Sequence, residues 1–267
     1  MIRLSCVQMT STNDVVENLT KIKNVLINQE MDVLVLPEMC LDMGNKYNNP
    51  LTLTFKQSFN ELSELAKANN TILIAGTIKQ PQIGQSKKLA GCFVFDAFGA
   101  KIVDYQKIHL FDADVNDKQG TYRESDHFDS GTNPVVFDAH INNKMVKVGI
   151  AICYDLRFSL LFHELKKRGA QLIVVPAAFV YATGKAHWEV LLKARAIEFG
   201  VYIFACNQTG WHDESRQTFG HSMLINPWGE VVDSLGEQEA LLNCRLETSE
   251  LINPKKALLS FNHTKAF

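Results

Sequence analysis

Several features that would place the chain in a specialised class are absent from its sequence. No apolar stretch approaches the ~20 residues that cross a bilayer. The first residues, MIRLSCVQMTS, lack the basic segment and apolar core of a secretory signal. The 27 Lys and Arg residues nearly balance the 29 Asp and Glu residues, which leaves a formal net charge of −2. We therefore expect a chain that binds neither a membrane nor nucleic acid.

Motifs for nucleotides and metals are also missing. The sequence contains no G-x-x-x-x-G-K-[ST], no G-x-G-x-x-G and no H-E-x-x-H. Its six cysteines show neither C-x-x-C spacing nor a zinc-like Cys/His cluster. Scattered cysteines of this kind are typical of reduced thiols and indicate a cytoplasmic location. We expect no metal and no cofactor.

The composition that remains is that of an ordinary globular protein. Hydrophobic residues make up 46% of the 267 residues and charged residues 21%. No linker rich in proline or serine and no block of like charge interrupts the chain. We therefore expect a single domain that spans residues 1–267.

The chain contains a faint internal duplication. Each half reads as helix, strand, helix, strand and hairpin, and each hairpin turn carries an aromatic residue followed by glycine. The expected segments are 14–26, 33–36, 55–68, 71–75 and 91–105 in the first half, and 160–167, 172–175, 188–199, 201–206 and 220–234 in the second. Two such units predict an α/β fold, a four-layer α-β-β-α sandwich. A doubly wound parallel sheet is the alternative, which the paired hairpins disfavour.

Three predicted strands end in reactive side chains. The segment DVLVLPE ends in Glu38, IVDYQK ends in Lys107, and the apolar run from Val146 to Ile152 ends at Cys153. A thiol attacks a carbonyl as a thiolate and needs a base nearby. A carboxylate in apolar surroundings can be that base, while an ammonium group and a backbone N–H, here that of Tyr154, stabilise the oxyanion. The three strand ends therefore predict acyl transfer. A Cys–His pair is the competing interpretation, but no histidine follows a strand as Glu38 does.

The same motifs carry a family resemblance. VLVLPEM, YQKIHLFD and CYDLRF resemble the three motifs of the nitrilase superfamily of carbon–nitrogen hydrolases, and their spacings of 69 and 46 residues agree with that family. GKAHWEVLLKARAIE and GHSMLINPWGE extend the resemblance over nearly the whole chain. The resemblance implies the α-β-β-α sandwich with an internal pseudo-two-fold duplication. It also implies a homodimer that pairs through the helix after the cysteine and the HWEVLLKARAIE region.

Residue roles follow from this resemblance. It implies that Glu38 is the general base, that Cys153 is the nucleophile forming a thioester, and that Lys107 stabilises the tetrahedral intermediates. Glu124 matches a second family glutamate that helps to position Lys107 or the substrate nitrogen. Asp155 and Arg157 are expected to hold the turn after the nucleophile through an ion pair. Residues expected to bind substrate are Tyr154, Phe179, Thr183, His187 and Asn207.

Within the superfamily, the chain is most similar to amidases that cleave deaminated glutathione into 2-oxoglutarate and cysteinylglycine. Omega-amidases, which act on 2-oxoglutaramate or 2-oxosuccinamate and release ammonia, share many of the same sequence motifs. The substrate implied is thus a small-molecule amide of a 2-oxo acid. A true nitrilase and a catalytically silent binding subunit stay open as alternatives. Ser159 and Leu160 replace the usual Pro-Glu after CYDLRF, which is expected to affect the pairing surface and not the catalytic residues.

Overall fold

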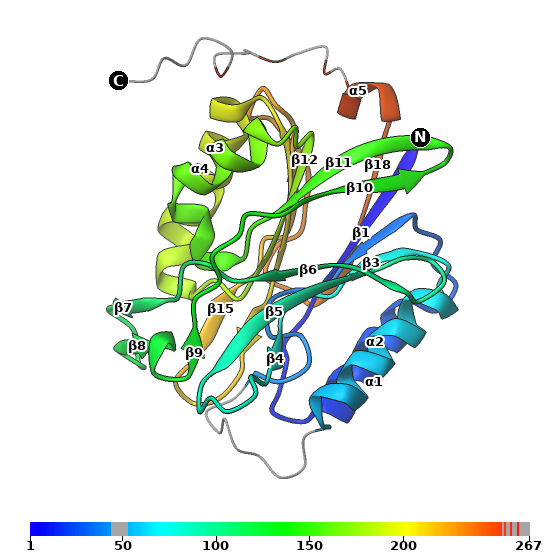
Figure 1. Ribbon diagram of the computed structural model, residues 1–267. Helices are drawn as coiled ribbons and strands as arrows, with labels where there is room; N and C mark the ends of the chain where they lie inside the picture. The colour runs from blue at the N-terminus through cyan, green and yellow to red at the C-terminus, as the bar shows by residue number, and fades with distance from the viewer. Residues whose placement is uncertain (44–52, 253, 255–256, 258–260, 262–267) are drawn as a thin grey trace.

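The structure is a computed structural model, and it describes residues 1–43, 53–252, 254, 257 and 261. Two large β-sheets face each other, and helices cover the outer face of each (Figure 1). Helices α1 (Val15–Val25) and α2 (Phe55–Ala68) lie on one side, and α3 (Ser159–Lys167) and α4 (Tyr181–Phe199) lie on the other. A short helix, α5 (Thr248–Ile252), follows the last strand. The predicted four-layer α-β-β-α sandwich is confirmed.

The first sheet has the order β18-β1-β2-β3-β5-β4, with β6 and β9 also pairing with β5. Its strands are β1 (Ile2–Gln8), β2 (Val33–Val35), β3 (Ile72–Ile74), β4 (Ile78–Gln80), β5 (Lys88–Phe95), β6 (Lys101–Gln106), β9 (Phe128–Asp129) and β18 (Ala240–Leu246). β1, β2 and β3 are parallel, and β5 and β6 follow as antiparallel neighbours. β6 therefore runs in the direction of β3 and ends at the same edge of the sheet.

The second sheet repeats this path in the order β10-β11-β12-β13-β16-β17. Its strands are β10 (Val136–Ile141), β11 (Lys144–Ile150), β12 (Leu172–Ala177), β13 (Tyr202–Asn207), β16 (Met223–Ile225) and β17 (Val231–Ser234). β11, β12 and β13 are parallel, and β16 and β17 follow antiparallel. The two halves thus share strand order and direction, which confirms the internal duplication.

Two small hairpins lie outside these sheets. β7 (Asp112–Asp114) pairs with β8 (Thr121–Arg123), and β14 (Thr209–Trp211) pairs with β15 (Gln217–Phe219). Both follow strands of the large sheets at the edge where the parallel strands end. They therefore surround that edge with loops.

Side-chain alternation explains why both faces of the first sheet are covered. In β2, Val33 and Val35 belong to the apolar core that includes the second sheet, whereas Leu34, and Leu36 directly after the strand, belong to the layer beneath α1 and α2. Successive residues of a strand point to opposite faces, so an unbroken apolar run is buried on both sides. The carboxyl end of β2 is thereby held between two packed layers.

The helix boundaries follow their capping residues. Asp14 accepts from the backbone N–H groups of Val16 and Glu17 and begins α1 as predicted, and Thr54 forms a capping box that begins α2. Gly200, with φ of 58°, ends α4. The predicted start of α4 at residue 188 is wrong, because the helix begins at Tyr181. Gly184 lies inside it where a Cβ would approach Phe219 Cβ to 2.4 Å, so this glycine allows close packing and does not break the helix.

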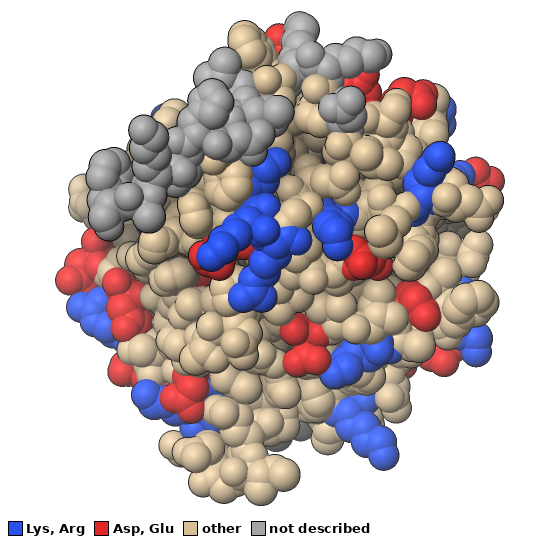
Figure 2. Space-filling view, turned by 45° about the horizontal axis from the view of Figure 1, so that its top comes forward, with Lys and Arg blue, Asp and Glu red and all other residues tan. Residues whose placement is uncertain are grey.

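Charge is mixed on the face drawn in Figure 2, where a small group of basic side chains lies next to acidic ones and uncharged surface separates it from the rest. That face therefore carries no continuous basic track of the kind that a phosphate backbone requires. None of the helices in the described part of the chain has the length and apolar character to cross a bilayer.

Candidate active site

Glu38 follows β2 and lies at the edge where the parallel strands end. The residue is 4% exposed. Oε2 accepts a hydrogen bond from the backbone N–H of Ala178 at 2.9 Å, and Gln208 Nε2 donates to the Glu38 carbonyl at 3.0 Å. Ala178 follows β12 of the second sheet, so the carboxylate of one half is oriented by the backbone of the other.

Lys107 follows β6 and is 1% exposed. Its Nζ lies 2.7 Å from Glu38 Oε1 and 2.7 Å from Glu124 Oε2. A buried ammonium group is stable only when it is paired, and here two carboxylates pair with it. Behind it, the backbone N–H of Gly131 donates to the Lys107 carbonyl at 2.8 Å, and a Cβ at Gly131 would lie 2.1 Å from the Gln106 carbonyl oxygen. The loop can approach the strand end this closely only because residue 131 is a glycine.

Cys153 lies at a sharp turn after β11 and is 7% exposed. Its φ of 47° is in the left-handed region, which non-glycine residues adopt at a cost of about 1–3 kcal/mol unless the surroundings hold them there. It begins a short 3-10 turn that spans Cys153–Arg157. The strand therefore stops at the sulfur, and the chain turns away behind it.

The side chain of Asp155 holds this turn. It is fully buried and accepts hydrogen bonds from the Ile152 N–H at 2.8 Å and from the Tyr105 hydroxyl at 2.6 Å through Oδ2. Oδ1 accepts from the His109 N–H at 3.0 Å and lies 2.7 Å from His109 Nδ1. The predicted ion pair between Asp155 and Arg157 is wrong, because these partners occupy the carboxylate and Arg157 points elsewhere. The turn that carries Cys153 is thereby tied to both flanks of Lys107.

Glu124 lies at the start of a 3-10 turn, Glu124–Asp126, after β8. Its Oε2 accepts from Lys107 Nζ and also from the Phe111 N–H at 2.7 Å, and its own N–H donates to the Phe111 carbonyl at 3.2 Å. The carboxylate is thus fixed by the backbone before it meets the ammonium group. Glu124 is in a position to orient Lys107.

The electrostatics of the cluster follow from burial and mutual charge. Burial and the neighbouring Glu38 carboxylate raise the pKa of the Cys153 thiol well above its usual range, and Lys107 opposes them in part. Burial alone would lower the pKa of Lys107, but Glu124, Glu38 and Cys153 together raise it well above its usual value. At neutral pH the resting cluster therefore holds a protonated thiol beside an ammonium group and a carboxylate that can accept the thiol proton.

The predicted catalytic residues line one cavity of about 60 Å³. Its lining comprises Glu38, Met39, Lys107, Phe111, Gln119, Tyr122, Arg123, Glu124, Phe128, Cys153, Ala178 and Arg216. A second, narrow crevice of about 10 Å³ also borders Cys153 and is lined by Tyr154, Arg157, Phe179, Val180 and Thr183 together with Phe111, Cys153 and Ala178. Cys153 thus lines both the catalytic cavity and the crevice.

Of the five predicted substrate residues, Tyr154, Phe179 and Thr183 line the crevice, and the other two lie behind it. His187 contacts the Arg157 guanidinium, with Nδ1 3.3 Å from Nη2. Asn207 is fully buried; its Oδ1 accepts from the Phe179 N–H at 2.9 Å and its Nδ2 donates to the Gly220 carbonyl at 2.7 Å. These two are placed to position crevice residues.

Sequence reasoning did not find Gln119 and Arg216. Gln119 Oε1 and Arg216 Nε are buried beside the cavity without a hydrogen-bond partner among the residues that the structure describes. Both come from loops, where no strand pattern marks a residue for the site. Within the described ranges, no three His, Cys, Asp or Glu side chains are grouped as metal ligands.

Comparisons with known proteins agree with this geometry. Residues 3–250 match the sequence profile of the carbon-nitrogen hydrolase family. The chain belongs to that family.

Among similar proteins, the deaminated glutathione amidase of Synechocystis sp. is 34% identical over 97% of this chain and 96% of its own length. Omega-amidase NIT2 of Mus musculus is 33% identical over 93% and 90%. The nitrilase and fragile histidine triad fusion protein NitFhit of Drosophila melanogaster is 36% identical over 87% of this chain, which spans only 50% of that relative. The crystal structure of the Caenorhabditis elegans NitFhit protein superimposes with a TM-score of 0.85 at 31% identity, covering 99% of this chain and 65% of that one.

Proposed function

We propose that the protein hydrolyses the amide bond of a small 2-oxo acid amide, with deaminated glutathione as the preferred substrate, through a thioester on Cys153. The observation that carries the proposal is the buried cavity in which Cys153, Glu38 and Lys107 meet, with Lys107 Nζ 2.7 Å from Glu38 Oε1. Thiol, base and fixed positive charge are the three groups that cysteine-based acyl transfer requires.

Acylation begins when Glu38 takes the proton of the Cys153 thiol as the sulfur attacks the amide carbonyl carbon. The oxygen of the tetrahedral intermediate becomes negative, and the Lys107 ammonium and the Tyr154 N–H stabilise it. Glu38 then gives its proton to the amide nitrogen. The C–N bond breaks, the amine leaves, and the acyl group stays on the sulfur as a thioester.

Deacylation reverses the roles of the same groups. Glu38 takes a proton from water, the hydroxide adds to the thioester carbonyl, and the C–S bond breaks to release the carboxylic acid. The proton returns to the sulfur. Throughout, Glu124 holds Lys107 in place. The position of the ammonium group therefore does not depend on Glu38 alone, and it stays directed at the oxyanion.

The crevice supports a 2-oxo acid as the acyl half of the substrate. The Arg157 guanidinium lies 5.2 Å from the centre of the Phe179 ring and 5.8 Å from that of Tyr154. No carboxylate of the described residues lies within ion-pair distance of it. Arginine binds carboxylates through paired N–H donors, so Arg157 is placed to hold the acid group. His187 would keep Arg157 in position, and Thr183 would add a hydroxyl.

The names of the relatives support the same substrate class and define its rival. Relatives named deaminated glutathione amidase and omega-amidase are similar to this chain at nearly equal identity, 34% and 33%. The purified protein should therefore be incubated with deaminated glutathione and with 2-oxoglutaramate, and 2-oxoglutarate should be quantified. A higher kcat/KM for 2-oxoglutaramate would assign an omega-amidase. Absence of turnover on both, and on simple amides and nitriles, would favour a binding subunit.

We also propose a homodimer, a single domain and a cytoplasmic location. Exposed apolar side chains on α3, α4 and the β16–β17 turn support pairing through this face; they are Leu160, Val190, Ile197 and Trp228. All six cysteines are free and buried, which suits a reducing compartment. Light scattering of the purified protein tests the dimer, and its failure would leave the proposed chemistry untouched.

A further inference from the structure

A larger cavity lies beside the catalytic one. Its volume is about 370 Å³, within the ~300–1,000 Å³ typical of small-molecule sites, whereas the catalytic cavity is about 60 Å³. The two share Met39, Glu124 and Phe128 as lining residues. A ligand that reacts at Cys153 can therefore extend past Glu124 into this space, which we call the side cavity.

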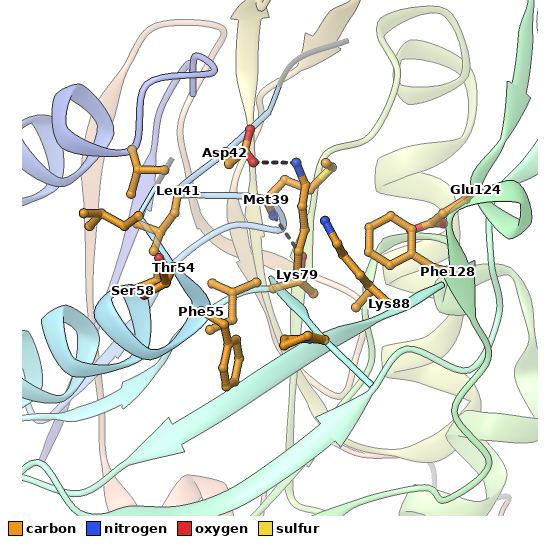
Figure 3. A pocket seen from close by; sticks show the side chains of 16 residues that line it. Met39, Leu41, Asp42, Thr54, Phe55, Ser58, Lys79, Lys88, Glu124 and Phe128 are labelled. Carbon is orange, nitrogen blue, oxygen red and sulfur yellow. Dashed lines mark hydrogen bonds and ion pairs between the residues drawn. The ribbon is translucent and has the colours of Figure 1, made fainter. Parts of the chain in front are cut away.

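The walls of the side cavity are mostly apolar, and its lining also includes four charged side chains, those of Asp42, Lys79, Lys88 and Glu124. Apolar walls come from the strand ends and from α2, and Figure 3 shows Phe55, Thr54 and Ser58 on the helix side. Opposite them, Lys79 of β4 pairs with Asp42, with Nζ 2.5 Å from Oδ2. Lys88 of β5 lies between Lys79 and Phe128, and Glu124 lies beyond that ring (Figure 3).

The two ammonium groups are close enough to disfavour each other. Burial lowers the pKa of Lys79, Asp42 opposes this effect, and the charge of Lys88 lowers that pKa further. Lys79 and Lys88 share this cavity with the carboxylates of Asp42 and Glu124, so a ligand carboxylate would bind at the part where the two ammonium groups lie. Asp42 Oδ1 is buried with no hydrogen-bond partner in the described part of the chain, so it offers an acceptor to a ligand N–H or S–H at the same place.

The direction of the substrate across Cys153 follows from these surroundings. Glu38, which protonates the departing nitrogen, and Glu124 line the catalytic cavity that shares residues with the side cavity, whereas the crevice with Arg157 is lined by neither carboxylate and shares no lining residue with the side cavity. The acyl half thus extends toward Arg157 and the amine half toward Lys88.

We propose that the side cavity binds the leaving-group half of an N-substituted amide, a short peptide-like amine, and that Lys88 and Lys79 bind the carboxylate at its far end. Cysteinylglycine has this chemistry, with its terminal carboxylate a few bonds from the scissile nitrogen. This inference rests on the proposed function and deepens it, because ammonia, the leaving group of an omega-amidase, needs no such cavity.

The test compares Lys88→Ala with wild type on two substrates that share the acyl half. With deaminated glutathione, Lys88→Ala should lower kcat/KM about tenfold more than with 2-oxoglutaramate, mainly through KM. Lys88→Arg should restore most of the loss. Lys87→Ala removes a lysine one position away that does not line the side cavity, and it should leave both rates as in wild type.

Deaminated glutathione with its glycine carboxylate converted to an amide provides the second arm. Wild type should lose affinity for this analogue, and Lys88→Ala should show no further loss. The inhibition constant of cysteinylglycine should rise in Lys88→Ala, and that of 2-oxoglutarate should not.

Equal losses on both substrates, or no loss on either, would overturn the side-cavity assignment and leave the amidase intact. Wild-type turnover of 2-oxoglutaramate alone would overturn it as well. Wild-type inactivity on both substrates would instead remove the proposed function, and the inference with it.

Discussion

The half of the chain from β1 to β6 and the half from β11 to β17 follow one path, yet they supply different chemistry. Aligning Pro37, which follows β2, with Pro176, which lies near the end of β12, makes Glu38 equivalent to Ala177. By the strand registers of the two sheets, Cys153 in the second half is then equivalent to Met9 in the first. The first half contributes the acid and the ammonium group, and the second contributes the thiol.

Backbone strain follows the same division. Cys153 adopts a positive φ and Met9 does not, and Met9 packs in the apolar layer beneath α1. One half thus uses its strand end for packing, while the other holds a nucleophile at a tight turn. Because neither half has the complete set, activity requires the two sheets to be packed against each other.

The largest effect is expected from removing the thiol of the second half. Cys153→Ala should lower kcat by on the order of 10⁴-fold or more, since no thioester can form. Mass spectrometry of enzyme quenched during turnover should then show no acyl adduct. Cys244→Ala, a buried thiol on β18, is the control and should retain activity. Adding Met9→Cys to Cys153→Ala should not restore turnover. Restored turnover in this double variant would show that the strand end of the first half can also present a nucleophile.

Glu38→Gln removes the base of the first half while keeping its shape. Acylation measured in single turnover should fall about 10³-fold. Because the Glu38 charge raises the pKa of Cys153, its loss should also move alkylation of the thiol by iodoacetamide to lower pH. Glu30→Gln, an exposed carboxylate paired with Arg3, should leave both measurements unchanged. An alkylation profile displaced to higher pH would contradict the assigned contact.

Glu124→Gln tests the loop that joins the halves. Losing one charge-assisted partner of Lys107 should lower kcat about 10- to 100-fold with a smaller change in KM. Asp126→Asn changes an exposed carboxylate in the same 3-10 turn and should have no effect. A rate unchanged in Glu124→Gln would show that Glu38 alone positions the ammonium group.

The smallest effect concerns a contact between the halves. His212 Nδ1 lies 2.8 Å from the Ser11 carbonyl oxygen, to which it donates, and Nε2 lies 2.7 Å from the Thr218 hydroxyl, which can donate to the neutral ring. Burial lowers the pKa of His212 from 6.5 to about 4. The unfolded chain therefore binds more protons between pH 6.5 and 4, and the free energy of unfolding should fall across that range by on the order of 2 kcal/mol. The free energy of unfolding, measured by urea titration at several pH values, should change less with pH in His212→Gln than in wild type. An equal change with pH in the two proteins would contradict the assignment.

Much of this arrangement could be predicted because it rests on local patterns. The helix at Phe55–Ala68 was predicted with its observed bounds, and the three strand ends indicated Glu38, Lys107 and Cys153. Contacts between distant segments were not predictable. The partners of Asp155 lie 46 and 50 residues away at His109 and Tyr105, so its neighbour Arg157 was wrongly chosen.

Loops and turns account for the rest. The β10–β11 hairpin was missed although Asn142 and Asn143 both adopt the positive φ that its turn requires. The side cavity draws Asp42, Lys79 and Lys88 from three separate segments, and no periodicity links them. Its existence depends on how those segments meet in space.

The protonated resting state of Cys153 also affects how readily the enzyme is inactivated by oxidation. Peroxides and electrophilic metabolites react with thiolates, and a thiol whose pKa is raised well above its usual range presents almost none of that form at neutral pH. In the proposed mechanism, the sulfur loses its proton only as it attacks a bound carbonyl group. Oxidation of Cys153 should therefore be slow in the substrate-free enzyme and should take place during turnover.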